Sequence, residues 1–577
     1  MLRRPLLSAA ARGTRTGPRR ATTTTTMTAT AARRLARALS GAPETTATTT
    51  VPAVPGASPG SASASADSRV LPLSSLTAVS PVDGRYARKT RALRHHFSEY
   101  ALIKARAEVE VRWVQRVCGG GGGRKEDFKS MAPELPTLTA ESNAALERLV
   151  REFSLHDAER VKEIEKTTNH DVKAVEYFLR ERLQADTSTR ALSPVVHFTC
   201  TSEDVSNLAY GLMLKSALDR VILPAMDEII VALAQKAVDA ADASMLSRTH
   251  GQPATPTTLG KELAVFAFRL AHHRQSVASC VVPGKFSGAV GNYAAHAEVL
   301  PDVDWPATAR AFVTRDLGLA WNPYTTQIES HDGVAEVVHA VSRFNTALLS
   351  LDRDLWQYVS LGYLKQHVVE GEVGSSTMPN KVNPIDFENS EGNLGLANAL
   401  FGHLAEKLPV SRMQRDLSDS TVMRALGSGF AHSLVAYESA LQGLRRVDPD
   451  VAAMAKDLDG HWEVLAEPLQ TVARRYGIEG MYERMKELTR GRTLGRAEYA
   501  ALVADLPVPD HARGSLAKLT PARYTGYSKR LAETLVNEHL PNAQYVVAAD
   551  EEDVAPAAGA SVAKVAPERA AKQKPAA

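Results

Sequence analysis

Apolar residues recur along the middle of the chain at intervals of three and four positions, the spacing that places them on one face of an α-helix. The stretch TRALRHHFSEYALIKARAEVEVRWVQRV, residues 90–117, is one example. The same pattern returns in residues 203–242, 257–282, 333–364, 389–408 and 420–447. Strand-like alternation is sparse, so the sequence predicts an all-α protein.

The stretch 203–242 is long enough for a single helix of about 40 residues, with a kink expected at Pro224 because proline lacks a backbone N–H. Helices of this length with wide apolar faces bury those faces in a bundle or between subunits. The sequence therefore predicts a bundle of long helices at the centre of the protein.

Both ends of the chain have a composition that does not support a folded core. Residues 546–577 form an Ala-rich tail, which we expect to be disordered. Residues 1–70 contain ten arginines, no lysine and only two acids, the first of which is Glu44. Such a segment is typical of a transit peptide, although a plain disordered extension has the same composition. The threonine tract favours a plastid and the Arg-rich ARRLARAL favours a mitochondrion, and we expect an organellar protein, with plastid ahead of mitochondrion.

Charge and composition exclude several classes of protein. The chain of 577 residues is 44% hydrophobic and 23% charged, as expected of a globular protein. The net charge is +3 and residues 1–70 contribute +8, so the remainder carries −5, which argues against a general nucleic-acid binder. The three cysteines lie far apart and fit a reducing compartment. No apolar run approaches the ~20 residues of a membrane-spanning helix, and neither a Walker motif nor a strand–GxGxxG–helix unit is found.

Five connections between the predicted helices carry clusters of polar residues. Their sequences are TTNHDVKAVEYF, HFTCTSEDVSN, SRTHGQPATPTT, GSSTMPNKVNPIDFENSEGN and RDLSDSTVMR. Taken singly, most have a structural explanation. The segments 169–171 and 201–204 suit helix caps. His250 alone in a turn, or Arg415 and Arg424 on a surface, needs no catalytic role.

The segment GSSTMPNKVNP, residues 374–384, is harder to explain as a plain connection. Pro379 and Pro384 restrict its backbone, whereas Gly371 and Gly374 allow it to hinge. This combination is typical of a mobile lid that closes into one defined shape. We refer to residues 371–384 as the signature loop.

The signature loop resembles the signature of the fumarase/aspartase superfamily, the β-eliminating lyases that release fumarate. The other polar connections, together with NPYTTQIESHD, LPVSRMQRDLSDSTVMR and HWEVLAEPLQTVARRYGIE, resemble the adenylosuccinate lyase family in its bacterial-type branch. The similarity covers roughly residues 72–545. One position departs from the family, because Asn380 stands where this branch usually has His, and we expect that change to tune the loop.

The resemblance implies a β-elimination that breaks a C–N bond and needs both a base and an acid. It assigns the base to Ser375, whose hydroxyl must be activated as an alkoxide by Lys381 and nearby backbone N–H groups. It assigns stabilisation of the dianionic intermediate to Lys381 and Asn383. His250 is then the general acid. His170 supports His250 or a substrate phosphate.

The resemblance also implies contacts to a nucleotide substrate with a succinyl group, and no cofactor. The contacts to the nucleotide end are Arg85, Tyr86, Arg415, Ser420 and Arg424. The contacts chiefly to the succinyl side are Thr201, Ser202, Gln327, Ser376 and Asn389. Three neighbours, Asn169, Asp171 and Thr421, complete the predicted substrate site. The implied reactions release fumarate from adenylosuccinate, giving AMP, and from the succinylated aminoimidazole carboxamide ribotide, giving the carboxamide, both in purine biosynthesis.

The resemblance further implies a three-domain fumarase/aspartase-type fold and a homotetramer whose sites are shared between subunits. The predicted domains are an N-terminal helical domain at 71–198, a central bundle with the signature loop at 199–438, and a C-terminal helical domain at 439–545. Sharing is expected because residues 201–202 and His250 flank the long helix, yet are assigned to the same small substrate. Two alternatives stay open: another fumarate-releasing lyase (argininosuccinate lyase, fumarase or aspartase), or a non-enzymatic structural relative.

Overall fold

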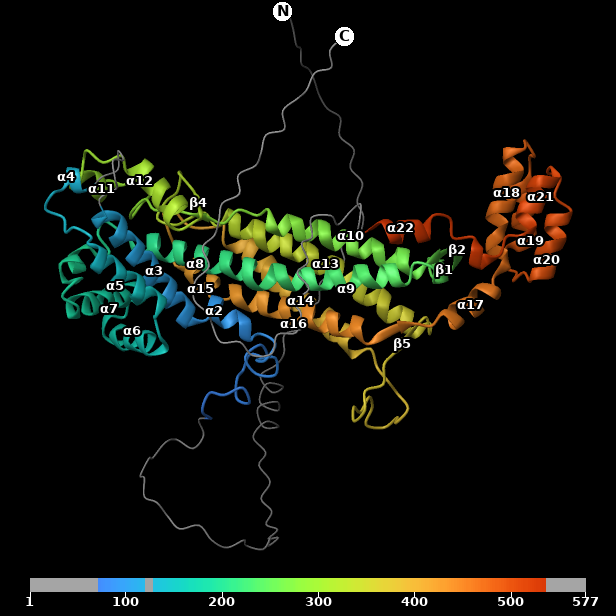
Figure 1. Ribbon diagram of the computed structural model, residues 1–577, viewed down its shortest axis with the longest axis horizontal. Coiled ribbons are helices and arrows are strands. Elements are labelled where there is room, and N and C mark those ends of the chain that lie inside the picture. The colour runs from blue at the N-terminus through green and yellow to red at the C-terminus, as the bar shows by residue number, and fades with distance from the viewer. Residues whose placement is uncertain (1–70, 120–127, 536–577) are drawn as a thin grey trace, which may run out of the picture. The chain divides into compact units, whose positions relative to one another are not determined.

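The computed structural model describes residues 71–119 and 128–535 of the chain (Figure 1). The predicted transit peptide and the predicted C-terminal tail lie outside these residues. Helices make up most of the described chain, as the spacing of apolar residues predicts. The first group of elements is η1 (Arg91–Leu93), α2 (Arg94–Phe97), α3 (Glu99–Cys118), α4 (Phe128–Met131), α5 (Ala140–Arg151), α6 (Leu155–Thr168), α7 (Asp171–Ala185) and η2 (Arg190–Val195).

Long helices that pack side by side form the next part of the chain. Helix α14 packs on α13 and α16, and α9 packs on α10 and α16. The bounds of the long helices are α8 (Ser202–Ala217), α9 (Leu223–Asp239), α10 (Leu259–Ala278), α13 (Asp332–Ser360), α14 (Ile385–Lys407) and α16 (Leu426–Arg445). Shorter elements between them are α11 (Ala294–Val299), α12 (Trp305–Ala311), η4 (Phe312–Asp316) and α15 (Ser418–Met423). The predicted helical bundle is thus present.

The predicted helix over 203–242 is nearly continuous, and its irregularity lies just before Pro224. Helices α8 and α9 are joined by one π-helical segment, η3 (Leu218–Ile222), in which the N–H of Leu223 donates to the carbonyl of Leu218. Proline cannot donate to the turn before it, so a wider turn at this point lets the helix continue. From Ser202 to Asp239 the rod spans roughly 57 Å at about 1.5 Å per residue.

Three short two-stranded sheets lie between the helices, and the sequence did not predict them. Strands β1 (Ser244–Thr249) and β2 (Gln252–Thr258) form an antiparallel hairpin directly after α9. Strands β3 (Pro283–Gly284) and β4 (Ala320–Trp321) pair in parallel, and β5 (Leu364–Gln366) pairs antiparallel with β6 (Val447–Pro449). They are too short and too polar to show a clear period of two.

A second, separate hydrophobic core lies in the C-terminal part of the described chain, in residues 462–524, which we call the C-terminal lobe. Its buried residues run from Trp462 to Leu516, apart from the main core that includes the long helices. The elements of the lobe are η5 (Trp462–Leu465), α18 (Ala466–Arg475), α19 (Met481–Thr489), α20 (Arg496–Ala504), α21 (Asp510–Ala517) and η6 (Pro521–Arg523). Before the lobe, α17 (Val451–Asp459) packs on β1, and after it, α22 (Ser528–Thr534) packs on α10. Among the described residues, we find no helix long and apolar enough to cross a membrane.

Candidate active site

The signature loop connects β5 to α14 and presents its polar side chains to solvent. The Oγ atom of Ser375 accepts hydrogen bonds from the backbone N–H groups of Thr377 (3.3 Å) and Met378 (3.0 Å). Donors aimed at a hydroxyl oxygen favour its deprotonated form. The same contact is also that of a serine capping a turn, so the base role of Ser375 stays a prediction. Lys381 is exposed in the same loop.

The fold of the signature loop depends on close backbone contacts. Asn383 donates from Nδ2 to the carbonyl of Gly374 at 2.5 Å. A Cβ atom at Gly374 would lie 1.9 Å from the carbonyl oxygen of Lys381, so only glycine fits there. The loop is also held at its base, where Arg446 pairs with Glu372 at 2.9 Å.

Tyr86 and Asn389, two predicted substrate contacts from distant parts of the chain, meet beside the start of α14. Asn389 donates to the Tyr86 hydroxyl at 2.9 Å, and Ser439 donates to Asn389 Oδ1 at 2.9 Å. Burial raises the pKa of Tyr86, but hydrogen bonds from Asn389 and Asn393 and the charge of Arg85 outweigh it, so the pKa is lowered. The structure therefore brings Arg85, Tyr86 and Asn389 together, and Asn389 lies five positions after the signature loop.

A second group of predicted residues gathers around the start of α8. Arg415 donates to Gln327 at 3.0 Å and pairs with Glu203 at 3.4 Å. Arg424 pairs with Asp171 at 3.1 Å. Ser420 and Thr421 lie in α15, between the two arginines in sequence, and Thr201 and Ser202 begin α8. We call this group the α8 cluster.

His170 and Asn169 have cap positions, as their structural explanation predicted. Asn169 ends α6 in the left-handed conformation, with a φ of 48°. His170 Nδ1 accepts from the N–H of Lys173 at 3.2 Å and so caps α7. Because Nδ1 is an acceptor there, the ring proton is on Nε2, which leaves His170 a donor for a substrate oxygen.

Glu203 is the most strongly perturbed acid of the α8 cluster. Burial raises its pKa to about 7, against the lowering effect of Arg415. The Nε atom of Arg415 is buried with no hydrogen-bond partner among the described residues. The cluster thus combines an Arg415 N–H group without a hydrogen-bond acceptor in the described chain and a Glu203 carboxyl whose pKa is raised to about 7.

Glu203→Gln is expected to stabilise the protein at high pH. The folded pKa of about 7 exceeds the ordinary value of 4.5, so the folded form binds an extra proton between those values. The free energy of unfolding then falls as pH rises through this window, and glutamine removes that loss. In urea titrations, this loss of unfolding free energy in wild type relative to the variant should be less than about 1 kcal/mol at pH 5 and grow by about 2–3 kcal/mol by pH 8. Equal midpoints at pH 8 would mean that Glu203 titrates normally.

The start of α8 is fixed by a buried ion pair that sequence reasoning missed. Lys285 and Asp204 are both fully buried, with Nζ 2.8 Å from Oδ1. Asp204 also accepts from the N–H of Thr201 at 2.9 Å and from that of Ser287 at 2.9 Å. It therefore joins the cap of α8 to the segment after β3. Only the capping pattern of Thr201 and Asp204 was visible in the sequence, because nothing near Lys285 marks it as buried.

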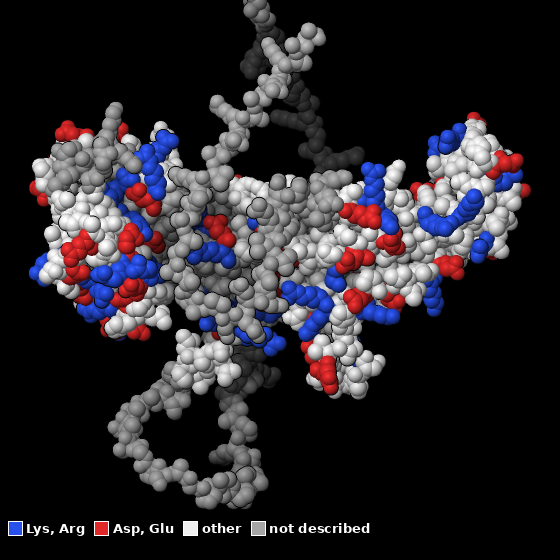
Figure 2. Space-filling model, viewed as in Figure 1, with Lys and Arg blue, Asp and Glu red and all other residues white. Residues whose placement is uncertain are grey.

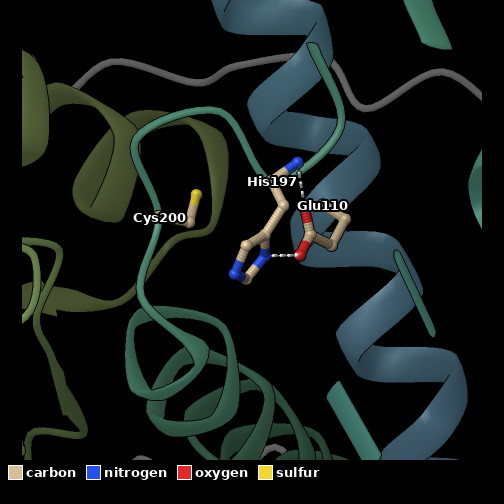
Figure 3. A group of neighbouring side chains, drawn as sticks. All are labelled: Glu110, His197 and Cys200. Atoms are coloured by element: carbon tan, nitrogen blue, oxygen red, sulfur yellow. Dashed lines mark hydrogen bonds and ion pairs between the residues drawn. The ribbon is translucent and has the colours of Figure 1, made fainter. Parts of the chain in front are cut away.

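The segment before Thr201 is held in an unusual backbone conformation. His197 and Thr199 have φ values of 64° and 63°, which are rare for residues with a side chain. Figure 3 shows how Glu110 secures this turn: its carboxylate accepts from His197 Nδ1 at 2.5 Å and from the His197 N–H at 2.9 Å. Strain of this kind concentrates at functional sites, and here it directly precedes two predicted substrate contacts.

Glu110, His197 and Cys200 are also the one group of possible metal ligands that we find in the described residues. Both Glu110 oxygens already accept hydrogen bonds from His197. Burial raises the pKa of the Cys200 thiol well above its usual value, so it stays protonated, whereas a metal requires the thiolate. The arrangement therefore fits a structural clamp better than a metal centre.

His250 lies at the turn of the β1–β2 hairpin, exposed and with a φ of 53°. It follows the end of α9, whereas the α8 cluster lies at the beginning of α8. The β1–β2 hairpin and the strand that leads to the signature loop are bound to the same carboxylate. Arg248 in β1 donates to Asp457 at 2.5 Å, and the hydroxyl of Tyr363, the residue before β5, donates to Asp457 as well. His250 and the signature loop thus belong to the same end of the helical rod.

Within one chain, the signature loop cannot meet the α8 cluster. Lys236, near the end of α9, donates to the carbonyl of Val447 at 2.8 Å. It lies 33 positions after Glu203, which is roughly 50 Å along the rod at about 1.5 Å per residue. The residue before Val447 is Arg446, which forms an ion pair with Glu372. Ser375 is three residues after Glu372, a separation of at most about 10 Å. Ser375 is therefore tens of ångströms from Arg415.

Comparison with known families finds two matches that together cover most of the described chain. Residues 84–398 match the family described as lyase, and residues 411–525 match the one described as adenylosuccinate lyase C-terminal. The adenylosuccinate lyase of Vibrio cholerae is 51% identical over 465 residues, which are 81% of this chain and all of that protein. The Escherichia coli K12 enzyme is 50% identical with the same coverage.

Solved structures at lower identity share the fold. The 3-carboxy-cis,cis-muconate lactonizing enzyme of Pseudomonas putida superposes with a TM-score of 0.61 at 22% identity, covering 78% of this chain and 97% of that one. A fumarate lyase from Mesorhizobium sp. BNC1 gives 0.59 at 20% identity, covering 78% and 98%. These structures confirm the predicted all-α fold. The matching family models and the relatives at about 50% identity define the chain as a lyase of the fumarase/aspartase superfamily. Within that class, the chain belongs to the adenylosuccinate lyase family.

Proposed function

We propose that the protein cleaves adenylosuccinate to AMP and fumarate, and cleaves the succinylated aminoimidazole carboxamide ribotide in the same way. The observation that carries the mechanism is the pair of N–H groups donating to Ser375 Oγ. These donors favour the alkoxide that removes a proton from the carbon beside a substrate carboxylate. Lys381 and Asn383 then meet the negative charge that develops on that carboxylate.

In this proposal the leaving nitrogen takes its proton from His250, and the α8 cluster binds the substrate. An imidazole titrates near neutral pH and can act as a general acid there. Arg415 and Arg424 suit phosphate oxygens because a guanidinium donates two parallel hydrogen bonds. Arg415 has a buried Nε without a partner in the described part of the chain, which supports this assignment.

We propose that each site is assembled from several subunits of a homotetramer. The α8 cluster and the signature loop lie tens of ångströms apart in one chain, yet both are assigned to one small substrate. Helical bundles build sites from side chains on facing helices, and a symmetric homo-oligomer can supply those helices from different subunits. Antiparallel association of the rods would bring the start of α8 in one chain next to the signature loop of another.

The direct test of the reaction is fumarate release from adenylosuccinate by the purified protein, followed by absorbance. We expect turnover with adenylosuccinate and none with argininosuccinate, malate or aspartate, since those compounds lack the phosphate that Arg415 and Arg424 would bind. Turnover of argininosuccinate or malate instead would identify another lyase of the superfamily. A protein that turns over none of these compounds would favour a structural relative.

We also propose that residues 1–70 direct the protein to an organelle, with a plastid ahead of a mitochondrion. Residues 1–70 contain ten arginines, and the first 43 residues include no acid, which supports this proposal. A fluorescent reporter fused to residues 1–70 is expected to enter the organelle, and protein lacking them should keep full activity. The matched control carries the ten arginines replaced by glutamine and should stay in the cytosol. Cytosolic fluorescence of the unaltered fusion would contradict the proposal.

A further inference from the structure

A cavity of about 560 Å³ lies in the C-terminal lobe, between η5, α20, α21 and η6. Trp462 and Tyr499, which are almost fully buried, form part of its apolar wall. Four basic side chains also line it, namely Arg496, Arg513, Lys518 and Arg523. Its volume falls within the range of about 300–1,000 Å³ that small-molecule sites occupy.

The charge of the cavity is unbalanced. Asp510 is the one acidic residue in its lining, and it pairs with Arg513 at 3.4 Å. Arg496, Lys518 and Arg523 have no ion-pair partner among the described residues, although many other arginines of the chain are paired. Arg513 also keeps a buried Nε atom without a hydrogen-bond partner in that part of the structure. Unpaired cations around a concave surface attract an anion.

The walls of the cavity are connected to the hairpin that carries His250. Ser244 in β1 donates to the carbonyl of Ala522, the residue before Arg523, at 2.9 Å. Helix η5, which carries Trp462, packs on β2, and Thr255 in β2 donates to Glu467 shortly after η5. A ligand that draws Arg523 and Trp462 together would therefore act on both strands of the hairpin.

From the cavity, its charge and these contacts, we propose that the C-terminal lobe binds a nucleoside monophosphate that modulates the enzyme through the β1–β2 hairpin. The phosphate pairs with Arg496, Lys518 and Arg523, which are exposed at the cavity and whose positive charges suit its oxygens. The base and ribose occupy the space beside Trp462 and Tyr499. This site is separate from the α8 cluster and from the signature loop, and its effect on turnover rests on the proposed lyase activity.

Calorimetric titration of the full-length protein with each of the four ribonucleoside 5′-monophosphates tests the binding. The cavity variant is Arg496→Gln, Lys518→Gln and Arg523→Gln combined. The matched control is Lys486→Gln, Arg490→Gln and Arg492→Gln combined, which removes the same charge from exposed positions of the same lobe outside the cavity. At least one nucleotide should bind wild type and control alike and bind the cavity variant at least about tenfold more weakly.

Three outcomes would overturn the proposal in different parts. If no nucleotide distinguishes the cavity variant from the control, the cavity is not a nucleotide site. If inorganic phosphate binds as tightly as the nucleotide, the apolar wall contributes nothing. If binding is lost in the variant but the nucleotide does not change kcat of the wild type at saturating substrate, the coupling to the hairpin is wrong. The calorimetric result stands whether or not fumarate is released, so it separates failure of this proposal from failure of the proposed reaction.

Discussion

Ser375→Ala is expected to abolish turnover of adenylosuccinate while leaving its binding largely intact. Two backbone N–H groups converge on Ser375 Oγ and stabilise negative charge there, so the lost group acts in the transition state more than in the bound substrate. Removal of a general base lowers kcat by about 10²- to 10⁴-fold. Fumarate release gives kcat, and calorimetric titration with adenylosuccinate gives the dissociation constant, which should change by less than about threefold.

Ser376→Ala is the matched control for this substitution. Ser376 is the neighbouring serine of the same loop and is exposed, and it is assigned to the succinyl side of the substrate. We expect its loss to raise KM and to leave kcat within about tenfold of wild type, as for a residue that binds ground state and transition state alike. The opposite pattern, near-normal turnover without Ser375 and none without Ser376, would move the base to Ser376.

The fold was predictable where local signals and burial agree. Apolar spacing predicted the rod of α8 and α9, and Pro224 predicted the place where its helical geometry changes. The capping pattern of Thr201 and Asp204 marked the start of α8. The strands were not predictable. Four of them have two or three residues, and β1 and β2, with six and seven, carry too few apolar side chains to alternate clearly.

The composition of the α8 cluster was largely visible in sequence, but its electrostatics were not. The family resemblance assigned Arg415, Gln327 and Thr201 to the substrate site before any contact was known. The burial that raises the pKa of Glu203 and the pairing of Asp204 with Lys285 depend on residues about 80 or more positions away. Such long-range contacts leave no pattern in a local stretch of sequence, so they required the structure.

The separation within one chain makes a strong prediction about mixed oligomers. Arg415→Ala and Ser375→Ala proteins should each be nearly inactive, because one lacks a phosphate contact and the other the proposed base. If the α8 cluster and the signature loop of one site come from different chains, random exchange at equal amounts leaves roughly a quarter of the sites wild-type at both positions. Mixing is therefore expected to restore roughly that fraction of wild-type turnover. The same experiment with His250→Ala in place of Arg415→Ala asks whether the proposed acid and the proposed base come from different chains.

A matched control for the mixing experiment uses two substitutions in the same loop, each in a different protein. Ser375 and Lys381 belong to the same signature loop, so every loop in a mixture of Ser375→Ala and Lys381→Ala carries one of the two defects. That mixture should stay inactive even though its subunits exchange as readily. Mass spectrometry of differently tagged chains verifies that the subunits have exchanged, so that failed exchange is excluded as the cause of inactivity. If verified hybrids of Arg415→Ala and Ser375→Ala show no recovery, the two residues do not meet in a shared site. Because Arg415 and Ser375 lie tens of ångströms apart in one chain, such a result would mean that one of the two residues does not belong to the site.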